Sequence, residues 1–137
     1  MGVTVRYEGG MRFVGESASG RAIAMDAPAD SGGTGSEPTP VELLLNSIGG
    51  CTGMDIVYAL RKMRTPATGL TIRIEERRAS SFPRVVTNVH LDYEIAGEIP
   101  EENARRAVEL SLSTYCTVSN SLACVGEITH AVRVVPS

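Results

Sequence analysis

One cysteine lies where its sulfur atom has room to react. Cys51 sits inside the glycine-rich run Gly49–Gly53, whose small residues leave space around the sulfur. Ser47 and Asp55 lie four residues before and after Cys51, and on a helix this spacing places both on its face. A hydroxyl there can donate a hydrogen bond to a thiolate, whereas a carboxylate there would raise the pKa of the thiol. The alternative is that Cys51 is a small buried hydrophobe, which is the usual role of a free cysteine.

A second cysteine has a different setting. Cys116 precedes Thr117–Asn120, a segment of helix-capping residues, and a cysteine at a helix N-terminus is expected to have a lowered pKa. Cys116 and Cys51 are 116 − 51 = 65 residues apart, so they can meet only through the fold and match no local metal-ligand spacing. We interpret the third cysteine, Cys124, as a core residue.

Other motifs that carry chemistry are absent from the sequence. It holds no G-x-G-x-x-G, P-loop or G-x-S-x-G pattern, and Gly32–Gly35 lacks the lysine of a phosphate-binding loop. His90 and His130 both lie inside strand patterns, where a structural role is the simpler interpretation. We therefore expect no cofactor and no metal.

Composition narrows the class of protein. The chain has 137 residues, with 13 Lys plus Arg, 16 Asp plus Glu and a formal net charge of −3. This balance argues against nucleic acid as a partner. Three cysteines are too few for a disulfide scaffold, so we expect a cytoplasmic protein with reduced thiols. The apolar stretch Leu43–Met54 is too short for a bilayer, which takes about 20 residues, so we expect no membrane partner. One domain over residues 1–137 is the expected organisation.

The first third of the chain has the period of strands. Alternating patterns predict strands at Val3–Tyr7, Met11–Gly15 and Arg21–Met25, which together form a three-stranded meander. The segment Asp26–Pro38 has no periodicity and is predicted to be a loop.

A long helix is predicted to follow this loop. Thr39 can cap it, Pro40 suits its first position, and it should end near Met63. Its apolar residues point in nearly every direction, so it should be buried on all sides, which a single small domain achieves with difficulty. We therefore predict an obligate homodimer. The glycines of the Gly49–Gly53 run predict either close approach of another backbone or a break into two helices.

The remaining elements complete an α+β fold. Alternation predicts a hairpin of two strands, and the start signal of a second helix lies at Pro100-Glu101-Glu102. A short helix over Ser119–Ala123 and a last strand should follow. The strands expected after the long helix are Leu70–Arg78, Val85–Ile95 and Ile128–Val135. The predicted order is β-β-β-α-β-β-α-α-β, with antiparallel strands.

Three segments resemble the OsmC/Ohr family, and within it the YhfA-like branch. They are Pro38–Leu45 leading into Gly50-Cys51, Tyr115–Asn120, and Gly15–Gly20. The resemblance covers essentially the whole chain. It implies an intertwined homodimer with long helices at its centre and antiparallel-rich sheets outside.

The resemblance also implies an activity, the thiol-dependent reduction of organic hydroperoxides in oxidative-stress defence. A thiolate at Cys51 would attack the peroxide and become a sulfenic acid, and Cys116 would condense with it to a disulfide. A dithiol such as dihydrolipoamide would then restore the pair. Two alternatives stay open: a weakly catalytic or non-catalytic dimer that senses redox state or binds a small hydrophobic ligand, and thiols with a purely structural role.

Peroxidases of this family place a glutamate and an arginine beside the reactive thiol. Glu42 is the candidate for the acid, one residue after the family's position, and joins Cys51 and Cys116 as a candidate catalytic residue. Ala18 stands at the arginine's place in the Ohr branch, so Arg12 and Arg21 are the candidates for the cation.

Overall fold

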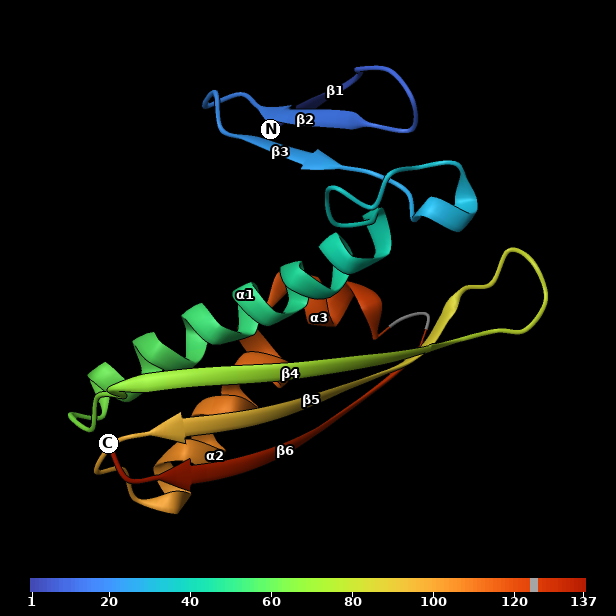
Figure 1. Cartoon of the computed structure of the whole chain (residues 1–137). Helices are drawn as coiled ribbons and strands as arrows, with labels where there is room; N and C mark the ends of the chain where they lie inside the picture. Colours follow the sequence, from blue (N-terminus) through green and yellow to red (C-terminus); the bar gives the residue numbers. More distant parts are fainter. Residues whose placement is uncertain (124–125) are drawn as a thin grey trace. The chain divides into compact units, whose positions relative to one another are not determined.

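The protein has a mixed α+β fold with two separate sheets (Figure 1). The computed structural model describes residues 1–123 and 126–137. The chain divides into two compact units, Met1–Leu44 and Leu45–Ser137. The predicted order of strands and helices is confirmed, and two short turns are added to it: a 3-10 turn η1 at Ala29–Ser31 and a π-helical turn η2 at Ser111–Tyr115.

The N-terminal unit contains the predicted meander. Its strands β1 (Val3–Tyr7), β2 (Phe13–Ser17) and β3 (Ala22–Met25) pair antiparallel in the order β1-β2-β3. Every residue of β1 is exposed, including its apolar side chains Val3, Val5 and Tyr7. This sheet therefore leaves apolar surface uncovered within its own unit.

The long helix α1 spans Pro40–Lys62, close to the predicted limits. Its start is fixed by a capping box, in which the Glu42 backbone N–H donates to Thr39 Oγ1 and the Thr39 N–H donates to Glu42 Oε1. Two cations, Arg61 and Lys62, lie in its last turn, where they complement the helix dipole. The helix is continuous through Gly49-Gly50, so the alternative of a break into two helices is wrong.

Two glycines of α1 make room for the neighbouring strand β4 (Gly69–Arg78). A Cβ on Gly49 would lie 2.6 Å from Ile74 Cδ1, and one on Gly53 would lie 3.2 Å from Ile72 Cδ1. Both separations are shorter than ordinary van der Waals contact. The predicted close approach is therefore present within the chain, but it involves side chains of a strand rather than a second backbone.

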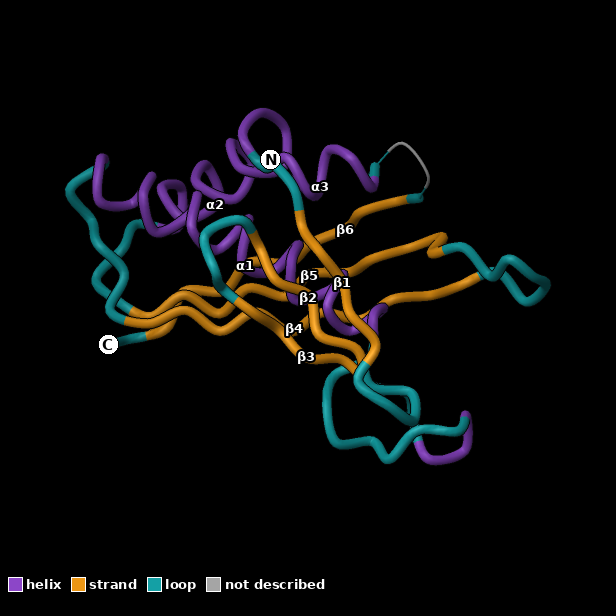
Figure 2. The backbone as a smooth tube through the Cα atoms, turned by 90° about the horizontal axis from the view of Figure 1, so that it is seen from above, coloured by secondary structure: helices purple, strands orange, loops and turns teal. Residues whose placement is uncertain are grey.

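The sheet of the C-terminal unit has the order β4-β5-β6, with β5 at Val86–Ala96 and β6 at Glu127–Val135. β4 and β5 form the predicted antiparallel hairpin. β6, however, pairs parallel with β5, which departs from the expected antiparallel strands. The reason is the long helical connection between them, which returns the chain to the end of the sheet where β5 began. Figure 2 shows the three strands side by side.

The helices α1, α2 (Glu101–Leu110) and α3 (Thr117–Leu122) contribute to one apolar core with this sheet. The buried core residues are Ile48, Ile56, Leu60, Val89, Leu91, Tyr93, Ile95, Ile99, Ala104, Ala107 and Val108. Buried and more exposed side chains alternate along β5. Since successive side chains of a strand point to opposite faces, β5 is buried on one face.

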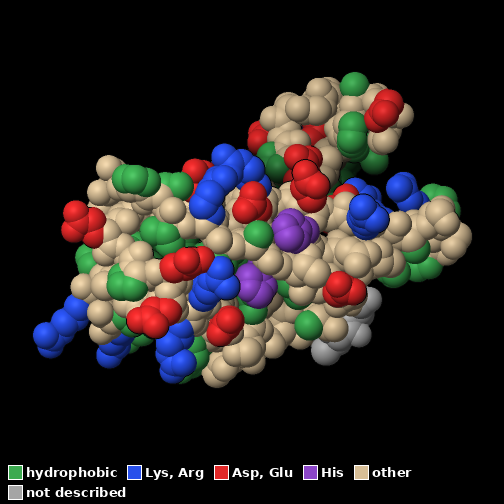
Figure 3. Space-filling model, turned by 90° about the horizontal axis from the view of Figure 1, so that it is seen from below, with side chains coloured by type: hydrophobic (Ala, Val, Ile, Leu, Met, Phe, Trp, Pro, Cys, Tyr) green, Lys and Arg blue, Asp and Glu red, His purple; other side chains and the backbone are tan. Residues whose placement is uncertain are grey.

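The other face of the sheet is polar (Figure 3). Glu94 on β5 pairs there with Arg73 of β4 and Arg133 of β6. The exposed His90 ring hydrogen-bonds the Thr129 hydroxyl at 2.6 Å, in accord with the structural role expected for this histidine.

Among the described residues, α1 has the length and mean hydropathy of a membrane-spanning helix. Length and composition are weak evidence for a span, because a core helix of a soluble protein meets the same criterion. Five of its residues are buried inside this chain: Ile48, Gly49, Thr52, Ile56 and Leu60.

Candidate functional site

Two cysteines and one aspartate meet in the C-terminal unit. Cys51 and Asp55 lie one helical turn apart on α1, and Cys116 is the N-cap residue of α3. The two sulfur atoms and a carboxylate oxygen of Asp55 all lie within 4.8 Å of one another. The fold thus brings together residues from distant parts of the sequence. Such a group can act as a redox pair or supply ligands for a metal ion.

The two thiols differ in their exposure to solvent. Cys116 is 1% exposed, whereas Cys51 is half-buried. The Cys116 sulfur accepts a hydrogen bond of 3.3 Å from the Ser119 backbone N–H, which is the capping interaction of α3. Burial nevertheless raises the pKa of the Cys116 thiol, and its hydrogen bond with Cys51 adds to this effect. The lowered pKa expected from the helix dipole is therefore wrong, because loss of solvent outweighs the dipole.

A π-helical turn positions the third member of the group. In η2 the Cys116 N–H donates to the Ser111 carbonyl at 2.8 Å, five residues back. The buried Ser111 hydroxyl then donates to Asp55 Oδ2, also at 2.8 Å. This bond links the turn before Cys116 to the helix that carries Cys51. Sequence reasoning missed Ser111, because no pattern distinguishes it from the polar residues that follow it.

Behind the thiols, a buried hydrogen-bond pair joins α1 to β5. The Tyr93 hydroxyl donates to Thr52 Oγ1 at 2.9 Å, and Thr52 in turn donates to the Ile48 carbonyl at 2.9 Å. Burial raises the pKa of Tyr93 to about 12, so this phenol stays neutral over the physiological range. Thr52 follows Cys51 directly, and these bonds hold that turn of α1 against the sheet.

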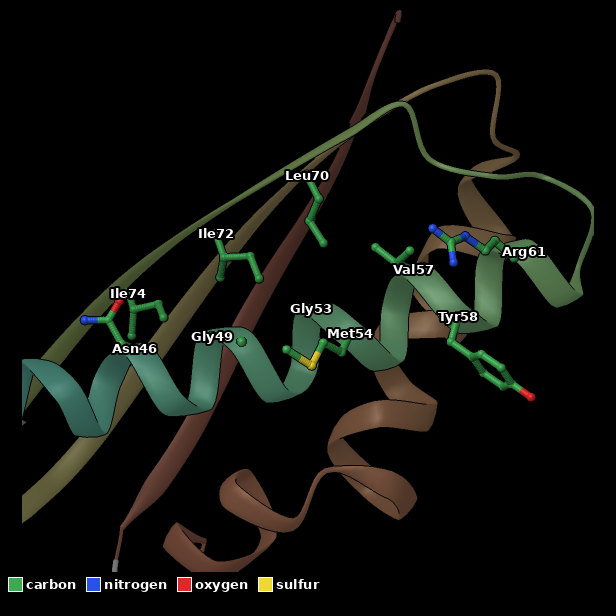
Figure 4. A pocket seen from close by; sticks show the side chains of 11 residues that line it. Asn46, Gly49, Gly53, Met54, Val57, Tyr58, Arg61, Leu70, Ile72 and Ile74 are labelled. Atoms are coloured by element: carbon green, nitrogen blue, oxygen red, sulfur yellow. The ribbon is translucent and has the colours of Figure 1, made fainter. Parts of the chain in front are cut away.

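Two of the hollows among the described residues border this part of α1. One of about 740 Å³ lies between α1 and β4; Figure 4 shows Leu70, Ile72 and Ile74 reaching from the strand toward Gly49 and Gly53. The other, of about 710 Å³, shares Asp55 and Ser111 with the thiol group. Its remaining lining residues are Tyr58, Ala59, Lys62, Met63, Leu110 and Tyr115. It is thus a largely apolar space next to Asp55 and Ser111, and Lys62 is the cation that lines it.

Comparison with known proteins places the chain in a family. The family model described as OsmC-like protein matches residues 33–130. The chain belongs to the OsmC-like protein family. Protein YhfA of Escherichia coli strain K12 is 34% identical to this OsmC-like chain over 137 aligned residues, which cover 98% of each chain. The resemblance inferred from the cysteine segments is thereby confirmed.

Solved structures share the fold of the OsmC-like chain. A hypothetical protein from Aquifex aeolicus VF5 superposes with a TM-score of 0.88 at 24% identity, covering 99% of this chain and 96% of the other. An organic hydroperoxide resistance protein from Elizabethkingia anophelis superposes with a TM-score of 0.74 at 17% identity, covering 98% and 97%. Similarity at this level of identity establishes the fold.

The remaining candidate residues of the OsmC-like chain are Glu42, Arg12, Arg21 and Cys124. Glu42 and Arg12 belong to the N-terminal unit, where Glu42 forms the capping box with Thr39 and Arg12 forms ion pairs with Glu8 and Glu37. Cys124, interpreted as a core residue, lies outside the described residues.

Proposed function

We propose that this OsmC-like protein is a thiol-dependent peroxidase that reduces organic hydroperoxides. The observation that carries the proposal is the approach of the Cys51 and Cys116 sulfur atoms to within 4.8 Å, one half-buried and one buried. A peroxide can reach the more exposed sulfur, while the buried one is close enough to form a disulfide after small side-chain rotations. The similarity to the Elizabethkingia structure, an organic hydroperoxide resistance protein, supports this proposed activity.

The proposed cycle has three balanced steps. The Cys51 thiolate attacks the terminal peroxide oxygen; the O–O bond breaks, and the leaving alkoxide takes a proton to become an alcohol. The resulting Cys51 sulfenic acid condenses with the Cys116 thiol to form a disulfide and water. A dithiol such as dihydrolipoamide then exchanges with this disulfide, leaving the protein reduced and the dithiol oxidised. We place this cycle in the cytoplasm, where thiols are kept reduced.

Purified protein should consume cumene hydroperoxide in the presence of dihydrolipoamide. Cys51→Ser should abolish turnover, while Cys116→Ser should accumulate a sulfenic acid on Cys51 that a dimedone probe labels. Cys124→Ser is the thiol-matched control and should keep its activity. Turnover in Cys51→Ser equal to that of the unmodified protein would overturn the proposal.

We also propose that Glu42 assists the reaction as the acidic partner of Cys51. Glu42→Gln is a clean test, because glutamine keeps the capping box with Thr39 while losing the charge. The expected result is a fall in the rate of Cys51 oxidation by roughly tenfold or more with unchanged thermal stability. An unchanged rate would remove Glu42 from the site.

We propose that the functional form is a homodimer, in which the whole chain acts as one domain and a second copy covers the apolar surface left open here. On α1, Met54 is 75% exposed and Tyr58 62% exposed, and both border the hollow against β4. Light scattering after gel filtration should give twice the chain mass, and Met54→Glu should give a monomer. Phe82→Glu, at a side chain 89% exposed, is the matched control and should remain dimeric.

A second candidate function is a redox-sensing or ligand-binding dimer with little turnover. The observation that favours it is the hollow of about 710 Å³ beside Asp55 and Ser111, together with the raised pKa of Cys116. A fatty acid should then raise the melting temperature in the unmodified protein and in Cys51→Ser alike. Fast peroxide turnover without any ligand-induced shift would reject this candidate.

A further inference from the structure

The thiol group has the donor atoms of a metal site. Two sulfur atoms and one carboxylate oxygen lie within 4.8 Å of one another, and they come from Cys51, Asp55 and Cys116. In a tetrahedral zinc site with bonds of about 2.3 Å to sulfur, two sulfur ligands lie roughly 3.8 Å apart. The two sulfur atoms lie within 4.8 Å of one another, so closing to that separation needs a movement of at most about 1 Å.

We propose that the reduced protein binds one Zn²⁺ ion through Cys51, Cys116 and Asp55. The inference goes beyond the peroxidase reaction, because zinc binding uses the thiols in their reduced state and involves no peroxide. Zinc is the ion that the donor set fits: it accepts both thiolate and carboxylate ligands, whereas Mg²⁺ and Ca²⁺ take oxygen ligands and Cu(I) favours sulfur alone.

Rigid elements hold the three ligands. Cys51 and Asp55 lie four residues apart on one helix, so their side chains share a face. Cys116 enters from the N-cap of α3, at the end of the π-helical turn. A ligand pair on a helix with a third ligand from another element leaves little conformational entropy to be lost on binding.

Hydrogen bonds outside the ligand group orient it. Ser111 donates to Asp55 Oδ2 at 2.8 Å, which leaves the other carboxylate oxygen for an ion. The Ser119 N–H donates to the Cys116 sulfur at 3.3 Å. Outer partners of this kind fix ligand orientation in metal sites, and their loss typically weakens binding roughly 10–100-fold.

The partial exposure of Cys51 leaves one coordination position of the ion open to solvent. Cys116 is buried but Cys51 is half-buried, so solvent reaches the group from the side of Cys51. Three protein ligands with a water in the fourth place is the arrangement of an open zinc site. Binding balances as Zn²⁺ plus two thiols and one carboxylate giving the bound ion and two released protons, with no change of oxidation state.

The test uses the full chain, reduced and without peroxide, so that its outcome is independent of peroxidase activity. Competition between the protein and a chromophoric chelator for Zn²⁺ should give one ion per chain. Co²⁺ should add thiolate-to-metal charge-transfer absorption. Cys51→Ser, Cys116→Ser and Asp55→Asn should each weaken Zn²⁺ binding roughly tenfold or more, and Ser111→Ala roughly 10–100-fold.

Asp92→Asn is the control for the carboxylate. Asp92 lies on β5 between the buried Leu91 and Tyr93, so its side chain is on the opposite face of the sheet, and binding should be unchanged. Zn²⁺ binding that is absent, or that is equal in Cys51→Ser and Asp92→Asn, would overturn the proposal.

A measurement on the unmodified protein covers the case in which a variant fails to fold. Bound Zn²⁺ should slow iodoacetamide labelling of both Cys51 and Cys116, as read by peptide mapping. Bound zinc with both cysteines labelled at the zinc-free rate would also overturn the proposal.

Discussion

Ser111 Oγ donates a hydrogen bond of 2.8 Å to Asp55 Oδ2, and this bond joins the turn before Cys116 to the helix that carries Cys51. The same bond helps to hold the two cysteines close to each other. Ser111 has no exposed surface, so its hydroxyl has no solvent to replace the carboxylate. The geometry of the thiol pair therefore depends on a residue that carries no chemistry of its own.

Ser111→Ala should lower the free energy of unfolding by about 1–3 kcal/mol, because the hydrogen bond to the half-buried Asp55 carboxylate is lost. Urea unfolding followed by circular dichroism measures the change. Ser113→Ala is the control, since Ser113 lies in the same turn but is exposed, and it should change stability by less than about 0.5 kcal/mol. Equal effects of the two substitutions would mean that the bond to Asp55 contributes nothing.

The two thiols should react with iodoacetamide in a fixed order. Cys51 is half-buried, whereas Cys116 is buried, so reagents reach Cys116 less easily, and its raised pKa leaves little of it as thiolate at neutral pH. Peptide mapping after timed labelling should find Cys51 modified first, and Cys116 labelling should accelerate as the pH rises. In urea the two should react at similar rates. Faster labelling of Cys116 in the folded protein would contradict the environment described for it.

Much of the fold was predictable because its elements have clear periods. Strict alternation predicted β1, and Thr39 and Pro40 marked the start of α1 correctly. The direction of β6 was missed, since alternation defines a strand but not the direction of its partner. The glycines of α1 predicted close approach of another backbone. A close neighbour of Gly49 exists, but it is the Ile74 side chain.

The candidate site was predictable only in part. Sequence patterns identified Cys51 and Cys116 separately, and the family resemblance brought them together. Ser111 was missed, because a π-helical turn has no sequence signature that separates it from an ordinary helix end. The pKa of Cys116 was predicted in the wrong direction, because the dipole argument used local sequence while burial arises from packing.

Tyr93 should make stability depend on pH in the alkaline range. Its pKa is about 12 in the folded protein against about 10 when unfolded, so unfolding releases a proton between these values. The free energy of unfolding should therefore be unaffected below pH 10 and fall as the pH rises toward 12, by at most about 2–3 kcal/mol from this group. In Tyr93→Phe the free energy of unfolding, measured by urea titration, should fall less steeply between pH 10 and pH 12. Tyr115→Phe, at an exposed tyrosine, should follow the unmodified protein; parallel curves for all three proteins would exclude this assignment.

Asp26 should control the order of the loop that follows β3. Its carboxylate accepts hydrogen bonds from the Thr34 hydroxyl at 2.7 Å, the Ser36 hydroxyl at 3.0 Å and the Ala27 N–H at 2.8 Å. The Thr34 hydroxyl is the main reason that the pKa of Asp26 lies well below its usual range, and the backbone donors reinforce it.

The sign of the pH effect of Asp26 follows from that lowered pKa. The stabilisation is fully present above the unfolded pKa of about 3.9 and is lost as the pH falls below it toward the folded value. Asp26→Asn should therefore raise the exchange rate of the Thr34 amide hydrogen, which also bonds Asp26, by roughly tenfold near neutral pH. Asp30→Asn, at an exposed acid of the same loop, should leave that rate unchanged. If exchange at Thr34 is the same in both variants, the loop is ordered by something other than the Asp26 carboxylate.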